Sequence, residues 1–241
     1  MGDNENIQIK LEVERRHLVL DGILTYPKEE KHIEENKGSK RKGIVVFAHG
    51  SGSGRHSPRN QYVASALNNS GITTLLVDLL TSEEQKFDES TREYRFNIRL
   101  LANRLSAVTD WLLTNNPAKI QNGYSIGYFG ASTGAAAALI AAAERLDDND
   151  DLVKAIVSRG GRPDLANSSY LKKVRAPTLL LVGSRDNPQV IALNQKALQQ
   201  LKNVKEKRLV MIQGAGHLFE EAGTLEEAAR HTASWFERYL F

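Results

Sequence analysis

Cysteine is absent from the 241-residue sequence. Its absence excludes disulfide bonds, thiolate nucleophiles and cysteine-ligated metal sites. No group of His, Asp and Glu residues has the spacing of metal ligands either. We therefore expect neither a metal nor another cofactor.

Long apolar runs are also missing. The longest, Ala135–Ala143, is too short to span a bilayer. The polar segment Met1–Asn6 lacks the basic flank and apolar stretch of a secretory signal. These features predict a cytoplasmic protein with no membrane partner.

Charge of one sign is scarce, because 32 basic residues face 29 acidic ones and leave a net charge of +3. No block of Lys and Arg with interleaved aromatic residues occurs, which predicts no basic face and no nucleic-acid partner. Residues 28–42 carry charges of both signs, and we expect them to form a solvated surface loop. Hydrophobic residues make up 41% of the chain, enough for a sizeable core.

The hydrophobic pattern predicts strands that alternate with helices. Ile7–Glu14 and His17–Tyr26 alternate apolar and polar residues, as an antiparallel pair of strands does. Short apolar runs typical of buried parallel strands follow at Ile44–Ala48, Thr73–Val77, Gly127–Phe129, Ala155–Val157, Thr178–Val182 and Leu209–Ile212. Helices are predicted between them at Arg59–Ser70, Glu93–Thr114, Gly134–Arg145, Gln189–Leu201 and Leu225–Tyr239.

This order predicts one α/β domain over residues 1–241. Its sheet should be mostly parallel, eight-stranded and doubly wound, with helices on both faces. The gap between Val157 and Thr178 has room for only one short helix, so no lid domain is expected there.

The segment Gly130-Ala131-Ser132-Thr133-Gly134 follows an apolar strand and opens an Ala-rich helix. It matches G-x-S-x-G, in which small residues permit a tight turn that exposes a nucleophilic serine. The alternative is that Ser132 only caps the helix. The two glycines at these offsets favour the nucleophile.

A second glycine-rich segment, residues 49–55, begins with His49-Gly50-Ser51 after an early strand. Its position suits an oxyanion loop, in which the N–H of Ser51, or of a neighbour, acts with the N–H of Thr133. A nucleotide site is the rival interpretation. It is disfavoured because Arg55 stands where phosphate-binding fingerprints require glycine.

A candidate acid and a candidate base follow later strands. Asp186 comes after the strand at Thr178–Val182, where a triad carboxylate would stand, and Asp164 is the alternative acid. His217 lies in a glycine-containing loop after the last strand, and His56 is the rival base. The order Ser132, Asp186, His217 is the chain order of a hydrolase triad.

These motifs resemble those of the α/β-hydrolase superfamily. Gly183-Ser184-Arg185-Asp186 and Gly214-Ala215-Gly216-His217 add to the two glycine-rich segments, and the chain is most similar to the dienelactone hydrolase-like branch. Dienelactone hydrolases proper use a cysteine nucleophile, whereas this chain offers Ser132. The resemblance therefore implies a serine carboxylesterase that acts on small soluble esters, with acyl transfer or thioester hydrolysis as alternatives.

Substrate selection is less clearly encoded. Arg55, Arg159 and Arg162 follow strands at the edge that carries the triad, and together with His56 they are candidates for binding substrate, in particular an anionic acyl group. The alternative is that the arginines pair with nearby acids. A non-catalytic ligand-binding protein on the same fold is a further hypothesis. The sequence holds no signal for the oligomeric state.

Overall fold

A computed structural model describes residues 4–13, 16–27, 43–115, 124–145 and 152–241. The expected loop at 28–42 lies outside these residues. The strands of the described residues form one eight-stranded sheet with the order β1-β2-β4-β3-β5-β6-β7-β8. They are β1 (Asn4–Val13), β2 (Arg16–Thr25), β3 (Gly43–Ala48), β4 (Thr73–Val77), β5 (Ser125–Ala131), β6 (Val153–Arg159), β7 (Thr178–Gly183) and β8 (Lys207–Ile212).

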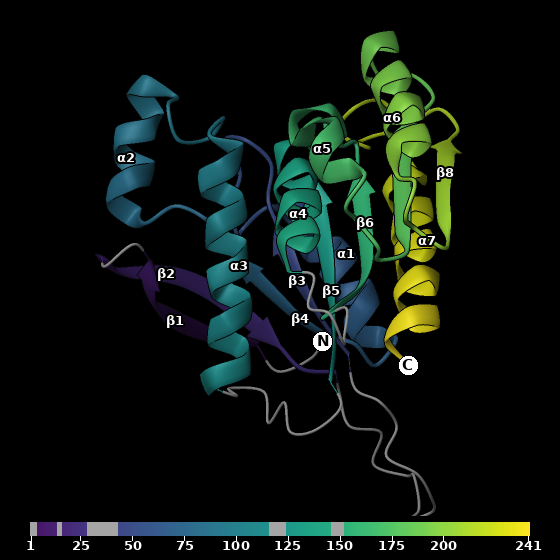
Figure 1. Cartoon of the computed structure of the whole chain (residues 1–241). Helices are drawn as coiled ribbons and strands as arrows, with labels where there is room; N and C mark the ends of the chain where they lie inside the picture. Colours follow the sequence, from purple (N-terminus) through teal and green to yellow (C-terminus); the bar gives the residue numbers. More distant parts are fainter. Residues whose placement is uncertain (1–3, 14–15, 28–42, 116–123, 146–151) are drawn as a thin grey trace, which may run out of the picture.

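The sheet confirms the predicted fold class. β1 pairs antiparallel with β2 and β2 antiparallel with β4, and all later pairings are parallel. The parallel strands β3, β4, β5 and β7 are buried throughout, because helices cover both faces of the sheet. Their carboxyl ends therefore meet at one edge, the upper edge in Figure 1.

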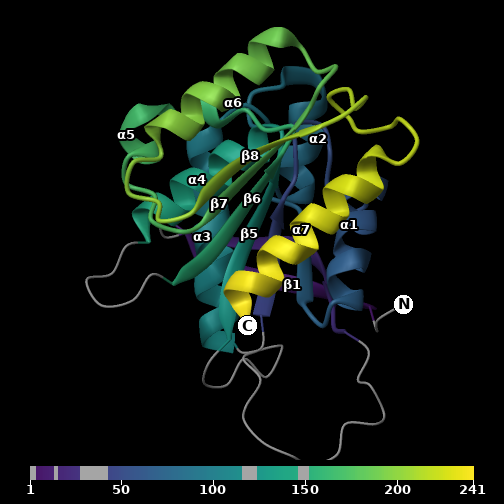
Figure 2. The ribbon, with the colours of Figure 1, turned by 90° about the vertical axis from the view of Figure 1, so that its right-hand side faces the viewer.

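The helices divide between the two faces of the sheet. One core contains residues of α3, α4, α5 and α6, and the other contains residues of α1 and α7. Figure 2 shows α1 and α7 side by side on their face. The helices are α1 (Pro58–Asn69), α2 (Ser82–Thr91), α3 (Ile98–Asn115), α4 (Thr133–Glu144), the 3-10 helix η1 (Pro163–Ala166), α5 (Asn167–Leu171), α6 (Pro188–Gln200) and α7 (Thr224–Leu240).

The region after β4 differs from the prediction. One helix was expected over Glu93–Thr114, but two are present, α2 and α3, joined by a short loop. Thr81 and Glu84 form a capping box that starts α2, and the side chain of Asn97 accepts a hydrogen bond from Leu100 N near the start of α3. The one buried residue of α2 is Asp88, which is charged. The helix therefore has no apolar face, and its sequence shows almost no hydrophobic periodicity.

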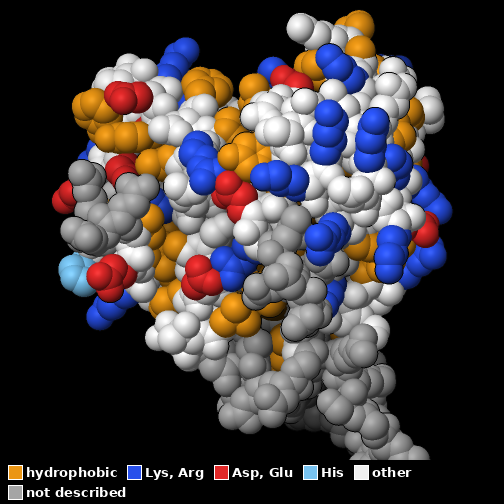
Figure 3. Space-filling view, viewed as in Figure 1, with side chains coloured by type: hydrophobic (Ala, Val, Ile, Leu, Met, Phe, Trp, Pro, Cys, Tyr) orange, Lys and Arg blue, Asp and Glu red, His pale blue; other side chains and the backbone are white. Residues whose placement is uncertain are grey.

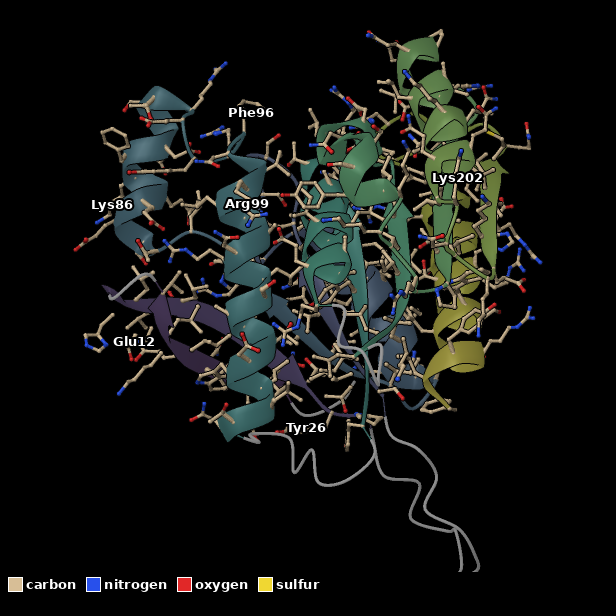
Figure 4. The ribbon with its side chains drawn as sticks, viewed as in Figure 1. Glu12, Tyr26, Lys86, Phe96, Arg99 and Lys202 are labelled. Carbon is tan, nitrogen blue, oxygen red and sulfur yellow. The ribbon has the colours of Figure 1, made fainter. Side chains whose placement is uncertain are left out.

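Arg99 ties three helices together on the α3 side of the sheet. Its guanidinium forms an ion pair with Glu144 of α4 and donates a hydrogen bond to Tyr170 Oη of α5 at 2.8 Å. Figure 4 shows Arg99 on the upper part of α3. The stretch between β6 and β7 holds only η1 and α5, so no lid domain is inserted there, as predicted.

The surface corrects one expectation. Figure 3 shows Lys and Arg side chains gathered over α5, α6 and the neighbouring edge of the sheet, so the prediction of no basic face was wrong. Two short stretches of sequence, one after α5 and one between α6 and the start of β8, hold exposed basic residues that a chain-wide count averages away; they are Lys172, Lys173, Arg175, Lys202, Lys205, Lys207 and Arg208. Among the described residues no helix is both long and apolar enough to cross a membrane.

Candidate active site

Ser132 stands at the sharp turn between β5 and α4. Its φ of 50° and ψ of −119° are rare for a residue with a side chain. The flanking glycines permit this turn, because a Cβ on Gly130 would lie 2.4 Å from Ala135 Cα, and one on Gly134 would lie 2.1 Å from Ala48 O. The Ser132 side chain makes no capping hydrogen bond, so the interpretation of Ser132 as a helix cap is wrong.

The two predicted oxyanion amides belong to Thr133, which follows Ser132 in the chain, and to Ser51 of the glycine-rich loop at residues 49–55. Thr133 is the first residue of α4, where a backbone N–H has no acceptor within the helix. Ser51 follows Gly50, whose backbone packs so closely against the turn that a Cβ there would lie 3.1 Å from Ser132 Cβ. The glycine-rich loop at residues 49–55 therefore lies directly beside Ser132.

His49 connects this loop to the residues that follow β4. Its Nε2 accepts a hydrogen bond from Leu79 N at 3.1 Å, and its Nδ1 lies 2.9 Å from Gly50 O. These contacts assign the neutral ring a proton on Nδ1, because Nε2 must act as the acceptor. Burial lowers the pKa of His49 and so favours that neutral form.

Asp186 and His217 meet in space although different strands precede them. His217 Nδ1 lies 2.9 Å from Asp186 Oδ2 and 3.2 Å from Oδ1. The Asp186 side chain is 1% exposed, whereas that of His217 is 38% exposed. The carboxylate is therefore enclosed, while the imidazole reaches the surface.

Close backbone packing sets this meeting point. Arg185 N donates to Ala215 O at 2.8 Å, and Gly214 N donates to Ser184 Oγ at 2.9 Å. A Cβ on Gly183 would lie 2.2 Å from Ala215 O. The loops that carry the acid and the histidine are thus joined directly.

A carboxylate outside the predicted set shapes the loop between β8 and α7 that carries His217, which we call the histidine loop. Glu221 accepts a hydrogen bond from Gly216 N at 2.9 Å, and this bond lowers the pKa of its carboxyl group. No motif predicts this contact, because a glutamate four positions after a histidine is common on any surface.

Ser132 and His217 line one cavity of about 190 Å³, which we call the Ser132 cavity. Its wall also includes Arg59, Asn60 and Arg159. Among the described residues the hydrogen bonds of the His217 ring go to Asp186, and none joins the ring to Ser132 Oγ. Such bonds are commonly long without substrate and tighten in the reactive complex.

Two of the three candidate arginines have carboxylate partners. Arg55 forms an ion pair with Asp78, and Asp78 also accepts a hydrogen bond from Arg55 N at 2.6 Å. The guanidinium of Arg55 lies 3.6 Å from Asp21 as well. Arg162 binds Asp164 through two hydrogen bonds of 2.9 and 2.8 Å, which raise the pKa of Arg162. Arg55 and Arg162 therefore fit the alternative interpretation, in which the arginines pair with nearby acids.

Arg159 differs from them. Its guanidinium donates to Asn60 Oδ1 at 3.1 Å and to Arg59 O at 3.3 Å, and it lies over the rings of Phe129 and Phe219. No carboxylate of the described residues pairs with it. Burial, and secondly the charge of Arg59, lowers the pKa of Arg159 to about 10, so the group is still charged at neutral pH. It is a buried cation in the wall of the Ser132 cavity.

The remaining candidates lie away from the imidazole. His56 is exposed and is not part of the wall of the Ser132 cavity, and Asp164 is engaged with Arg162. The ion pair between Arg59 of α1 and Glu220 of the histidine loop, at 2.6 Å, was not predicted. No sequence signal reveals it, because it depends on how α1 packs beside that loop. The described residues contain no group of three or more His, Asp or Glu side chains placed to hold a metal ion.

Comparison with known proteins places this geometry in a family. Residues 41–235 match the model of the alpha/beta hydrolase domain. The structure of a dienelactone hydrolase from Anabaena variabilis is 48% identical, covers 100% of this chain and 99% of its own, and superposes with a TM-score of 0.85. Est1E from Butyrivibrio proteoclasticus is 16% identical over 99% of this chain and 98% of its own, with a TM-score of 0.70, and shares the fold.

A relative from Mycobacterium tuberculosis has a different provisional name, phosphoribosyl transferase. It is 52% identical over 201 residues, which make up 83% of this chain. This chain spans only 42% of the length of that relative. More than half of the relative therefore lies outside the match.

Proposed function

This chain belongs to the α/β-hydrolase family, in its dienelactone hydrolase-like branch, and from that premise we propose that it is a serine hydrolase acting on carboxylic esters. The observation that carries the proposal is the strained turn of Ser132, with its side chain uncapped, in the same cavity as a histidine bound to a buried aspartate. A helix start that served only structure would not need this backbone conformation.

The proposed reaction proceeds through an acyl-enzyme. His217 takes the proton of Ser132 as its oxygen attacks the ester carbonyl, and Asp186 stabilises the imidazolium that forms. The N–H groups of Thr133 and Ser51 bind the oxyanion, each contributing about 3 kcal/mol. The alcohol leaves with a proton from His217, and water then releases the acid in a second step.

Arg159 supports a further feature of the proposal, a preference for acyl groups that carry an anion. A buried guanidinium without a carboxylate partner is costly unless its charge is used. Because Arg159 lines the same cavity as Ser132, its charge is available to an anion on the acyl group of a bound ester. Arg55 and Arg162 contribute less to such a preference, because carboxylates already occupy them.

Phosphoribosyl transfer is disfavoured as a function for this chain. The amide and guanidinium of Arg55 in the glycine-rich loop are both engaged by Asp78, and a carboxylate at that point repels a phosphate. The name of the Mycobacterium relative describes a protein of which this chain spans only 42%.

The test is labelling with a fluorophosphonate, which reacts with activated serine hydroxyls. We expect labelling and ester hydrolysis in the wild type and neither in Ser132→Ala. A wild type that is folded but unlabelled and inactive on all esters would favour a ligand-binding protein instead. Products formed with a competing alcohol or thiol distinguish hydrolysis from acyl transfer.

A further inference from the structure

A second cavity adjoins the Ser132 cavity at the same edge of the sheet. This second cavity, which we call the α2 cavity, measures about 320 Å³ and lies between the glycine-rich loop and the α2–α3 region. Gly50, Ser51 and Ser53 line both cavities. In Figure 1, α2 stands at the end of the molecule where the parallel strands finish. An ester whose carbonyl is bound at Ser51 can therefore place one part in each cavity.

Most of the charge in the α2 cavity is already balanced. The buried Asp88 binds Arg95 Nε at 2.5 Å and accepts hydrogen bonds from the backbone N–H groups of Tyr94 and Arg95. Asp78 is paired with Arg55. These internal pairs leave no excess of positive charge to attract an anion.

Several hydrogen-bonding groups in the wall remain available. The carboxamide of Gln85, the carboxylate of Glu89 and the hydroxyl groups of Ser51 and Ser53 make no hydrogen bond to other described residues. Gln85 and Glu89 lie four residues apart on α2, so they share one face of the helix. No described residue accepts a hydrogen bond from Arg95 Nη1, which lies 3.4 Å from where a Cβ on Gly52 would stand. The wall thus offers donors and acceptors in one place.

Apolar surface complements these groups. Leu80 and Leu101 line the same cavity. A neutral group that has C–H surface and several hydroxyl groups matches this wall, because each hydroxyl can both donate and accept. A simple alkyl alcohol would leave the polar groups to water and gain no hydrogen bonds from them, and a phosphorylated alcohol would face Glu89.

We propose that the α2 cavity binds the alcohol part of the substrate and that this alcohol is a neutral polyol, such as a glycerol or sugar unit. The inference rests on the proposed function. Ser132 Oγ bonds to the acyl carbon, the bond between that carbon and the polyol oxygen breaks, and the proton on His217 goes to the polyol oxygen. Water then hydrolyses the acyl-enzyme, so the products are a carboxylic acid and a free polyol.

The experiment compares acetate esters that differ only in the alcohol. We would measure kcat/KM for 6-O-acetylglucose, glycerol monoacetate, propyl acetate and choline acetate. The wild type is expected to favour the two polyol esters over propyl acetate by about tenfold or more, since sites that bind a hydroxyl discriminate against analogues without it. In the Gln85→Ala/Glu89→Ala double variant this ratio should fall by about tenfold.

Lys86→Ala is the matched control. Lys86 lies on the same helix but outside the cavity wall, and Figure 4 shows it on the outer side of α2. The control should keep the wild-type ratio. An equal ratio in the wild type and the double variant would overturn the proposal, and so would a preference for choline acetate, which would indicate a cationic alcohol.

A binding measurement separates this inference from the proposed function. Ligand-observed NMR would follow 6-O-acetylglucose with Ser132→Ala protein, which needs no catalysis. Binding that disappears when Gln85→Ala and Glu89→Ala are added supports the polyol site even if no ester is hydrolysed. The absence of binding, or binding unchanged by these substitutions, rejects it.

Discussion

His217 Nδ1 lies 2.9 Å from Asp186 Oδ2, although the two residues are 31 positions apart in the chain. The carboxylate can hold the ring with its proton on Nδ1, which leaves Nε2 free to act as a base. Asp186 Oδ1 also accepts a hydrogen bond from Asn187 N at 2.7 Å, so the carboxylate itself is fixed.

Asp186→Asn should preserve the fold and remove this control of the tautomer. We expect kcat for ester hydrolysis to fall by about 10⁴-fold, the size of effect that follows loss of the aspartate in a serine triad. Asp164→Asn is the control, because Asp164 pairs with Arg162 and not with the histidine. Comparable losses in both variants would contradict the role given to Asp186.

Gly134→Ala tests whether the turn at Ser132 requires glycine. A methyl group would lie 2.1 Å from Ala48 O, so α4 or the strand must move. We expect a loss of about 3 kcal/mol in the free energy of unfolding and a drop in kcat of about 10²-fold from the displaced serine.

Gly214→Ala offers the comparison for backbone strain alone. Gly214 has a φ of 77° but open space around its Cβ position. This variant should lose only about 1 kcal/mol. Denaturant unfolding and steady-state kinetics on both variants would decide, and equal destabilisation would argue against the steric explanation.

The sheet and the turn at Ser132 could be predicted from the sequence because their signals are local. Each buried strand is a continuous apolar run, and the turn at Ser132 needs glycine at fixed offsets. Helix α2 was not predicted, because it lacks this kind of local signal. It faces solvent and lacks apolar periodicity, although the capping residues Thr81 and Glu84 signalled its start.

The partners of the arginines could not be predicted in the same way. Arg55 and Arg159 look alike in sequence, since each is predicted to lie on a loop after a buried strand, whereas the structure makes Arg159 the last residue of β6. Their difference arises from packing, which brings Asp78 to Arg55 but places the backbone and Asn60 of α1 beside Arg159. Such choices depend on tertiary contacts between elements far apart in the chain.

His49 should make stability depend on pH. Burial lowers its pKa in the folded protein, so below about pH 6.5 the unfolded chain binds a proton that the folded chain resists. The contribution of His49 is therefore fully present at neutral pH and decreases as the pH falls, by up to about 1.4 kcal/mol per pH unit. The hydrogen bond to the Gly50 backbone and, secondly, the charge of Asp78 oppose this lowering of the pKa without reversing it.

Urea unfolding between pH 7.5 and 5 checks this expectation. The difference in free energy of unfolding between the wild type and His49→Gln should shrink as the pH decreases. His56→Gln, in the exposed part of the same loop, is the control and should keep the wild-type profile. A difference that stays constant over the whole range would contradict the prediction.

Arg159→Gln tests the preference for an anionic acyl group. The guanidinium lines the Ser132 cavity without a carboxylate partner, so a carboxylate on the substrate would gain a hydrogen bond to a charged group, worth about 1.5–3 kcal/mol. We therefore expect kcat/KM for monoethyl succinate to fall by about 10- to 100-fold more than that for ethyl butyrate. Arg162→Gln, whose arginine is already paired, should affect the two esters alike. Because Arg159 is buried against two aromatic rings, thermal unfolding must first show that the variant is folded, and equal losses on both esters in a folded protein would reject the preference.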